Sequence, residues 1–267
     1  MSSFAPTLPA LALRWLRATP SLKSLALRAA YLRSELERHP IGEIALALDA
    51  LTGLAEQAEP AARAVLTSLI PTLADPDLAS RVAQLRRASV EGALLPLGRL
   101  VRAGPLELPP PAAIDERKLA ASSTGRALTL GERRSLARKP SRAAFDKLLR
   151  DPHPMVIHNL LRNPRMTEDD VLRLAARRPA HPDVVVEILR HPEWSQRARV
   201  RMALIQNPGS PPEIAVPLVR LLIRPELRQV LAAADVSPLV RAAAQELLER
   251  RPPVPERGER GERGEPQ

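Results

Sequence analysis

The most constraining feature of this 267-residue sequence is a proline that returns at nearly regular intervals in its C-terminal half. A two-residue step ending in proline recurs there every 12 to 17 residues. The residue before a proline is pushed out of the α region, so each step ends a helix. The steps are Lys139-Pro140, Asp151-Pro152, Asn163-Pro164, Arg178-Pro179, His191-Pro192, Asn207-Pro208 and Arg224-Pro225. The pattern predicts a series of short helices.

Apolar side chains between these steps recur at helical spacing. Two of the stripes are Val156, Ile157, Leu160, Leu161 and Val184, Val185, Ile188, Leu189. The steps leave room for helices of 8 to 13 residues. Helices of this length are too short to be stable alone. Each must therefore bury its apolar face on its neighbours, as stacked repeats do. We predict an all-α fold in which residues 132–251 form an α-solenoid of short helix pairs.

The remaining sequence divides into three parts. Residues 1–102 predict four or five helices, one of them over 21–38. A fifth helical stretch is expected to begin near 78 and to be interrupted at Pro96 and Gly98. Residues 103–131 are rich in Pro and Ser and predict a linker, with polyproline II character in its first half; a short helix over 114–121 stays open. The tail, 252–267, carries Gly-Glu-Arg triplets and predicts disorder.

The composition excludes several kinds of site. The chain is 45% hydrophobic but only 2% aromatic, so its core must be built from Leu, Ala, Val and Ile. It has no cysteine, which excludes disulfides, thiolate zinc sites and cysteine-bound iron–sulfur clusters. Neither a targeting segment nor an apolar run long enough to span a membrane is evident, so we expect a cytoplasmic protein without a membrane partner.

The formal net charge is +10 and lies mainly in one region. Residues 136–251 hold 20 basic and 13 acidic side chains, an excess of +7. Such an excess favours a polyanionic partner. However, 36 of the 40 basic residues are Arg in a chain rich in Ala, Pro and Leu, which a GC-rich coding sequence also produces.

Cap patterns support the predicted helix boundaries. They are Thr167 with Asp170, Ser210 with Glu213 ahead of a helix starting at Pro211, and Ser237 before Pro238. Pro217 follows Pro211 by six residues, so it is expected to kink or split that helix.

Two stretches resemble known helical repeats. The segment from Asp235 to Leu248 resembles the second helix of a HEAT repeat, in which an Asp, a short gap, Val-Arg, a small residue and Leu recur. The Asn-Pro steps in 160–164 and 204–208 are similar to the leucine-rich repeat variant family. Over residues 136–250 the resemblance implies a curved scaffold that binds proteins or, less often, nucleic acid. The variant family's cysteine-bound cluster cannot form here.

Arginines cluster at the predicted helix ends. They are Arg38, Arg150, Arg162, Arg177, Arg178, Arg190 and Arg224. They either form a basic ridge for phosphate or an acidic partner, or complement the negative ends of helix dipoles. We favour the second interpretation because antiparallel helices separate the ends. Arg150, Arg177 and Arg178 are expected at one edge, and Arg162, Arg190 and Arg224 at the other.

Seven residues are the candidate partner-binding set: Arg162, Arg177, Arg178, Arg190, Trp194, Arg197 and Arg201. Trp194 precedes an expected N-cap, Ser195. The chain resembles the HEAT-like alkylpurine glycosylases in architecture, and that resemblance implies a base-stacking role for Trp194. The interpretation that we favour is that Trp194 covers the helix entrance or the stem of Arg199.

The sequence gives no support for catalysis. His153 and His158 are five residues apart and point to different helix faces, which is unsuited to a metal pair. The acidic run 168–170 occupies a first helical turn, where negative charge is stabilising. No nucleophile elbow or phosphate loop is present. We expect a non-enzymatic scaffold that binds a protein without metal or cofactor; the alternatives are a nucleic-acid-binding protein and, third, a DNA-glycosylase-type enzyme.

Overall fold

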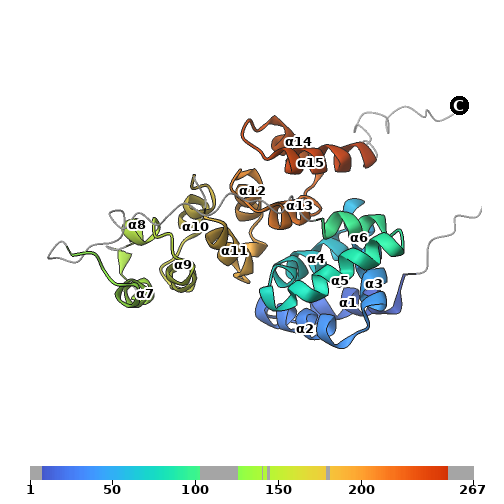
Figure 1. Cartoon of the computed structure of the whole chain (residues 1–267), viewed down its shortest axis with the longest axis horizontal. Helices are drawn as coiled ribbons and strands as arrows, with labels where there is room; N and C mark the ends of the chain where they lie inside the picture. The colour runs from blue at the N-terminus through green and yellow to red at the C-terminus, as the bar shows by residue number, and fades with distance from the viewer. Residues whose placement is uncertain (1–7, 103–125, 140, 143–144, 179–180, 252–267) are drawn as a thin grey trace, which may run out of the picture.

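The computed structural model describes residues 8–102, 126–139, 141–142, 145–178 and 181–251 (Figure 1). Within these ranges the regular elements are α-helices and two short 3-10 helices. The predicted all-α class is therefore confirmed. The expected polyproline stretch, the helix over 114–121 and the tail 252–267 lie outside the described residues. Across those same ranges, no helix combines the length and the apolar character needed to cross a bilayer.

The N-terminal helices gather around α3. Their bounds are α1 (Ala10–Ser21), α2 (Leu25–Arg38), α3 (Ile41–Glu56), α4 (Pro60–Leu73), η1 (Pro76–Leu78), α5 (Ala79–Glu91) and α6 (Leu95–Leu100). α3 contacts α1, α4, α5 and α6, and its Ile44, Leu48 and Leu51 are buried in the centre. The helix expected over 21–38 begins later, at Leu25, because the Ser24 hydroxyl accepts the Leu27 N–H and caps it.

The C-terminal helices pack mainly on close neighbours in the chain. They are α7 (Leu130–Arg138), α8 (Phe145–Leu148), α9 (Pro154–Leu161), α10 (Glu168–Ala175), α11 (Pro182–Arg190), η4 (Trp194–Gln196), α12 (Ala198–Gln206), α13 (Pro212–Val219), α14 (Arg224–Ala232) and α15 (Pro238–Arg250). α7 contacts α9, α9 contacts α11, and α10 contacts α12. As Figure 1 shows, α7, α9 and α11 lie along one side of this row and α8, α10 and α12 along the other.

Two of the Asn-Pro steps tie helices together. Asn163, after α9, donates its amide to the carbonyls of Ala137 and Lys139 at the end of α7, at 2.7 and 2.8 Å. Asn207, after α12, donates in the same way to two carbonyls at the end of α10, at 2.7 and 2.9 Å. The last carbonyls of a helix have no partner within it, so each asparagine satisfies two groups that would otherwise be orphaned.

One predicted capping box is confirmed and another is wrong. The Thr167 hydroxyl accepts the Asp170 N–H, and the Asp170 carboxylate accepts the Thr167 N–H. Ser210, by contrast, is buried and donates its hydroxyl to the Leu204 carbonyl, so α13 begins one residue later than expected, at Pro212.

Two further predicted boundaries are corrected. Thr129 and Glu132 form a capping box that starts α7 at Leu130, inside the stretch assigned to the linker. Arg224 was expected to end a helix, but it is the first residue of α14. Pro225 follows it in the first turn, where the φ angle of proline is already helical.

Pro217 does not split α13. The helix runs through it and ends two residues later, at Val219. Pro20 lies one residue before the end of α1, and Pro71 lies two residues before the end of α4. A proline this near a C-terminus removes one amide donor and leaves almost no helix beyond it to be displaced.

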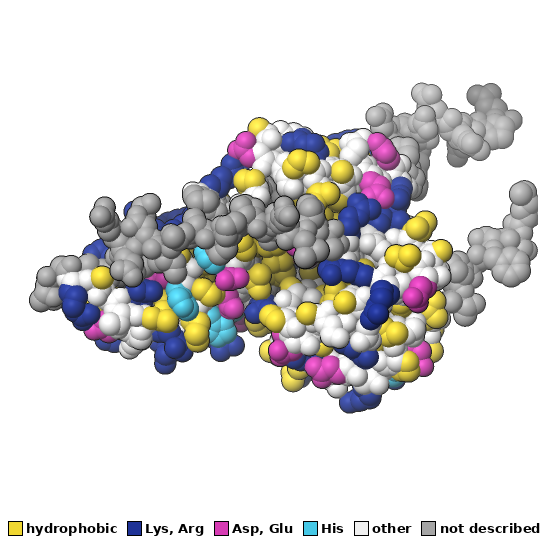
Figure 2. Space-filling view, in the orientation of Figure 1, with side chains coloured by type: hydrophobic (Ala, Val, Ile, Leu, Met, Phe, Trp, Pro, Cys, Tyr) yellow, Lys and Arg dark blue, Asp and Glu magenta, His cyan; other side chains and the backbone are white. Residues whose placement is uncertain are grey.

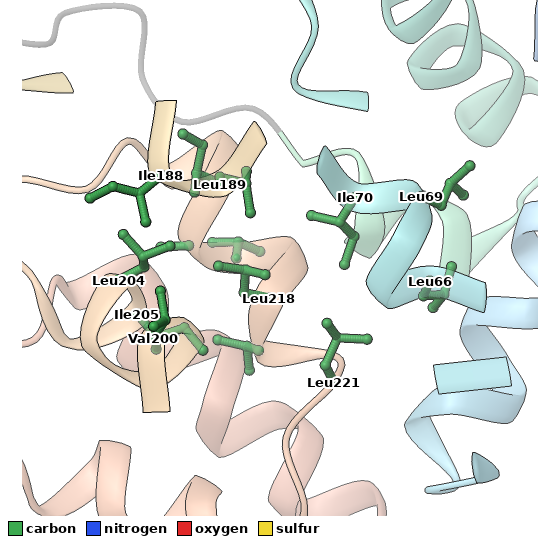
Figure 3. Close-up of a cluster of buried hydrophobic side chains, with 14 of the residues drawn as sticks. Leu66, Leu69, Ile70, Ile188, Leu189, Val200, Leu204, Ile205, Leu218 and Leu221 are labelled. Atoms are coloured by element: carbon green, nitrogen blue, oxygen red, sulfur yellow. The ribbon is translucent and has the colours of Figure 1, made fainter. Parts of the chain in front are cut away.

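The N-terminal helices pack side-on against the middle of the C-terminal row. α4 contacts α11, η4 and α13, and α6 contacts α13. Figure 3 shows Ile70 of α4 pointing towards a buried cluster that includes Leu218 and Leu221, with further members from α11 and α12. α7 lies at the far end of the row, away from α1–α6 (Figure 1). The N-terminal helices therefore do not extend the row at its α7 end.

Candidate functional site

A hollow lined by arginines lies between the ends of α8 and α10. Its lining residues are Asp146, Leu149, Arg150, Arg173 and Arg177, and we call it the arginine hollow. Its volume is about 620 Å³. Leu149 is buried and contributes apolar surface. The three guanidinium groups belong to Arg150 in the turn after α8, to Arg173 in α10 and to Arg177 in the turn after α10. An apolar surface bordered by cations suits a ligand that carries both aliphatic and anionic groups.

Among the described residues, the positive charge of the hollow is only partly balanced. Arg173 lies 3.6 Å from Asp146, but these side chains are 61% and 81% exposed, so water screens the pair strongly. Burial lowers the pKa of Arg177; the nearby Asp151 opposes that effect and the neighbouring Arg150 adds to it. Asp151 is itself engaged, because its Oδ2 lies 2.7 Å from Arg133 Nε.

Part of this site was predictable from the sequence. Arg177 was a candidate, and it lines the same hollow as Arg150, one of the two arginines expected at its edge. Arg150 and Arg173 were missing from the candidate set. Arg173 and Arg177 are four residues apart, which places their side chains on the same side where the chain is helical, and that spacing was a usable signal. Arg178 points elsewhere and pairs with Asp235.

Two of the candidate arginines are occupied inside the fold. Arg190 donates to the Ala74 carbonyl at 3.1 Å, across the contact between α11 and the N-terminal helices. Arg201 donates to the Ser195 and Gln196 carbonyls at 3.1 and 2.6 Å, and burial lowers its pKa. Both side chains therefore hold the structure together. Arg197 is exposed at the start of α12.

Trp194 is also a structural residue. Its side chain is buried in η4 and donates the indole N–H to the Leu161 carbonyl at the end of α9, at 3.0 Å. Ser195 is not an N-cap, because α12 begins at Ala198. The Arg199 guanidinium lies 3.9 Å from Glu168 and 3.7 Å from Asp169. In this position Trp194 cannot stack on a base.

Histidine side chains gather over α9 and α11 (Figure 2). His158 Nδ1 lies 2.8 Å from Glu187 Oε2 and connects these helices. Burial, aided by Arg162 and His158, lowers the pKa of His191 to about 4, so His191 is neutral at pH 7. His153 instead caps α9 by accepting the Met155 N–H. Among the residues described, no three His, Asp or Glu side chains are grouped so that they could hold a metal ion.

A second arginine-rich cluster is internal and surrounds Glu56 at the end of α3. Arg99 donates to both Glu56 carboxylate oxygens, and Arg220 Nη1 donates to one of them at 3.2 Å. Arg251 donates to the Glu56 main-chain oxygen at 2.6 Å. Arg220 is fully buried, and burial lowers its pKa to about 10 in spite of Glu56 and Glu246. This cluster joins α3 and α6 to α13 and α15.

No family model matches the sequence, and the chain has no match among the curated proteins or the solved structures.

Proposed function

We propose that this protein is a non-enzymatic helical-repeat scaffold of the HEAT-like kind that binds a protein partner at the arginine hollow. The observation that carries the proposal is the hollow itself, a concave site of about 620 Å³ with apolar surface and three arginines. Packing of each C-terminal helix on near neighbours, and the equivalent ties made by Asn163 and Asn207, support the repeat arrangement.

A nucleic-acid partner is the second candidate, and the +7 excess in residues 136–251 favours it. Much of that charge is used inside the fold, as Arg201, Arg220 and Arg251 illustrate. On the face shown in Figure 2, the visible basic side chains are interspersed with acidic and apolar ones. We therefore place the protein partner first.

Site-specific photo-crosslinking in an extract of the source organism tests the proposal. In the full chain, a crosslinking amino acid replaces Lys147, which is exposed and follows Asp146 of the hollow. In the control protein, the same amino acid replaces Arg87, which is exposed on α5. We expect one protein to crosslink at position 147 only, and the crosslink to disappear when Arg150→Glu and Arg177→Glu are added. Equal crosslinking from both positions, or crosslinking to nucleic acid, would argue against it.

A further inference from the structure

The ligand of the arginine hollow is constrained by the charges that line it. Among the described residues that line it are three arginines and one carboxylate, and that carboxylate, on Asp146, is highly exposed. Arg150 and Arg177 repel each other, and this repulsion adds to the burial that lowers the pKa of Arg177, although Asp151 opposes both effects. An incoming anion would relieve this repulsion, and planar guanidinium groups bind carboxylates with two parallel hydrogen bonds.

The surroundings of the hollow favour a short anion over a long one. Arginines on neighbouring elements already have carboxylate partners: Arg142 with Asp170, Arg178 with Asp235, and Arg199 with Glu168 and Asp169. A nucleic-acid backbone places a charge at every nucleotide and needs a basic track to match. The carboxylates of α10 interrupt such a track, whereas a peptide with a few acidic residues needs only the hollow.

We propose that the arginine hollow binds a short acidic segment of a partner protein, in which two carboxylates flank one aliphatic side chain. The carboxylates pair with Arg150 and Arg177, and the aliphatic side chain packs on Leu149. Arg173, already beside Asp146, borders the same site. This inference rests on the proposed function and adds the chemical class of the partner's segment.

Fluorescence anisotropy with labelled peptides tests it on the full chain. The probe is a ten-residue Gly/Ser peptide with a central Glu-Leu-Glu, and the reference peptides carry Gln-Leu-Gln or Glu-Gly-Glu. We expect Glu-Leu-Glu to bind at least tenfold more tightly than Gln-Leu-Gln, to weaken with added salt, and to bind better than Glu-Gly-Glu. Arg150→Glu with Arg177→Glu should reduce its affinity at least tenfold.

The matched control carries the same charge change elsewhere, in Arg165→Glu with Arg228→Glu, two exposed arginines outside the hollow. It should retain binding to within about twofold, and thermal melting should show that both variants are folded. If both double variants lose the same affinity for the Glu-Leu-Glu peptide, the binding depends only on net charge and the proposal is overturned. The proposal is also overturned if Glu-Leu-Glu does not bind at low salt. It is overturned as well if a 20-base-pair DNA duplex displaces the bound peptide at a lower concentration than unlabelled peptide does.

Failure here is distinguishable from failure of the proposed function. If the peptides do not bind but the crosslink from position 147 still depends on Arg150 and Arg177, the hollow binds a protein through other chemistry. If the crosslink is lost as well, the hollow is not a protein-binding site.

Discussion

At the scale of single residues, the arginines and asparagines of this chain act chiefly as donors to helix ends. Arg241 donates to the Leu231 and Ala233 carbonyls at the end of α14, at 2.6 and 2.7 Å. Arg81 donates to the Leu36 and His39 carbonyls around the end of α2. Many short helices have many C-terminal carbonyls without internal partners, and side-chain donors satisfy them. A large part of the basic composition is therefore a consequence of the short helices.

Asn207→Ala tests the importance of these ties. The substitution leaves two carbonyls at the end of α10 without their donor and removes the bond from the Gly209 N–H to the side-chain oxygen. We expect the free energy of unfolding to fall by about 1–3 kcal/mol, measured by urea denaturation. Asn159→Ala is the matched control, since the Asn159 amide bonds only to the Met155 carbonyl one turn earlier; it should cost less than about 0.5 kcal/mol.

Asp170 makes the stability depend on acidic pH. Burial, the largest single influence, raises its pKa, but hydrogen bonds from Arg142 and Thr167 outweigh it and lower the pKa to about 2. The folded-state pKa lies below the ordinary value of 3.8, so the contribution is complete above about pH 4 and is lost as the pH falls towards 2.

The corresponding prediction is that Asp170→Asn removes this pH dependence. Relative to the unsubstituted protein, the variant should lose about 2 kcal/mol of unfolding free energy at pH 6 and progressively less between pH 4 and pH 2. Asp183→Asn, an exposed carboxylate in the first turn of α11, serves as the control. A constant difference between Asp170→Asn and the parent from pH 6 to pH 2 would contradict the assignment.

The residues that end helices were predictable from the sequence, but their partners were not. Proline after Asn163 and Asn207 marks the breaks, because it excludes the helical conformation before it. The carbonyls that these asparagines bind lie 24 to 32 residues earlier in the chain, so local patterns carry no trace of them. The burial of Arg201 and Trp194 was not predictable either, because it depends on which helices pack together.

At the scale of elements, short helices are positioned by the turns that connect them. η4 is a single turn between α11 and α12, and its Trp194 reaches the end of α9 through the indole N–H. His191, at the start of the same connection, lies beside the Trp194 ring, with the ring centres 5.9 Å apart. This turn thus connects α9, α11 and α12 although it has only three residues.

Trp194→Phe separates the hydrogen bond from the packing of this turn. Loss of the N–H should lower the free energy of unfolding by about 1–2 kcal/mol, whereas Trp194→Ala, which also leaves a cavity, should lower it by about 3–5 kcal/mol. Chemical denaturation followed by circular dichroism measures both, and Met155→Ala at an exposed site on α9 provides the baseline. Equal effects of Phe and Ala would show that the bond to Leu161, and not the packing, dominates.

Element boundaries were predicted well where a cap pattern is local and poorly where tertiary structure competes for the capping residue. Thr167 and Asp170 complete their box within one turn. Ser210 has the sequence of a cap, but its hydroxyl is used by the Leu204 carbonyl. In the arginine hollow, Arg177 was found from its place at a helix end, whereas Arg173 lies within α10 and only its four-residue spacing from Arg177 pointed to it.

At the scale of the whole molecule, the two groups of helices meet along a junction that joins residues far apart in sequence. Arg63 donates to the Leu221 carbonyl, and Arg220 to the Glu56 carboxylate, across separations of 158 and 164 residues. No local pattern predicts such pairs, so the placement of α1–α6 against the middle of the row was invisible in the sequence. An apolar cluster and buried arginines lie together at this junction.

Glu56 is the charge on which this junction depends. Arg99 and Arg220 both donate to its carboxylate, and Arg250 lies 3.9 Å from it. Arg220 is fully buried, so it cannot recover hydration if its carboxylate is neutralised. Glu56→Gln should therefore lower the free energy of unfolding by about 3–5 kcal/mol, because a buried charge loses its partner.

The way in which the variant unfolds distinguishes a junction effect from a local one. If Glu56 couples the halves, calorimetry should resolve one transition for the parent and two for Glu56→Gln, with the α1–α6 amides exchanging separately from those of α7–α15. Adding Arg220→Met removes the uncompensated charge and should recover part of the loss. Glu59→Gln, one turn away and exposed, should leave a single transition. A single, uniformly weakened transition in Glu56→Gln would mean that the apolar contacts around Ile70 and Leu218 suffice to couple the two groups of helices.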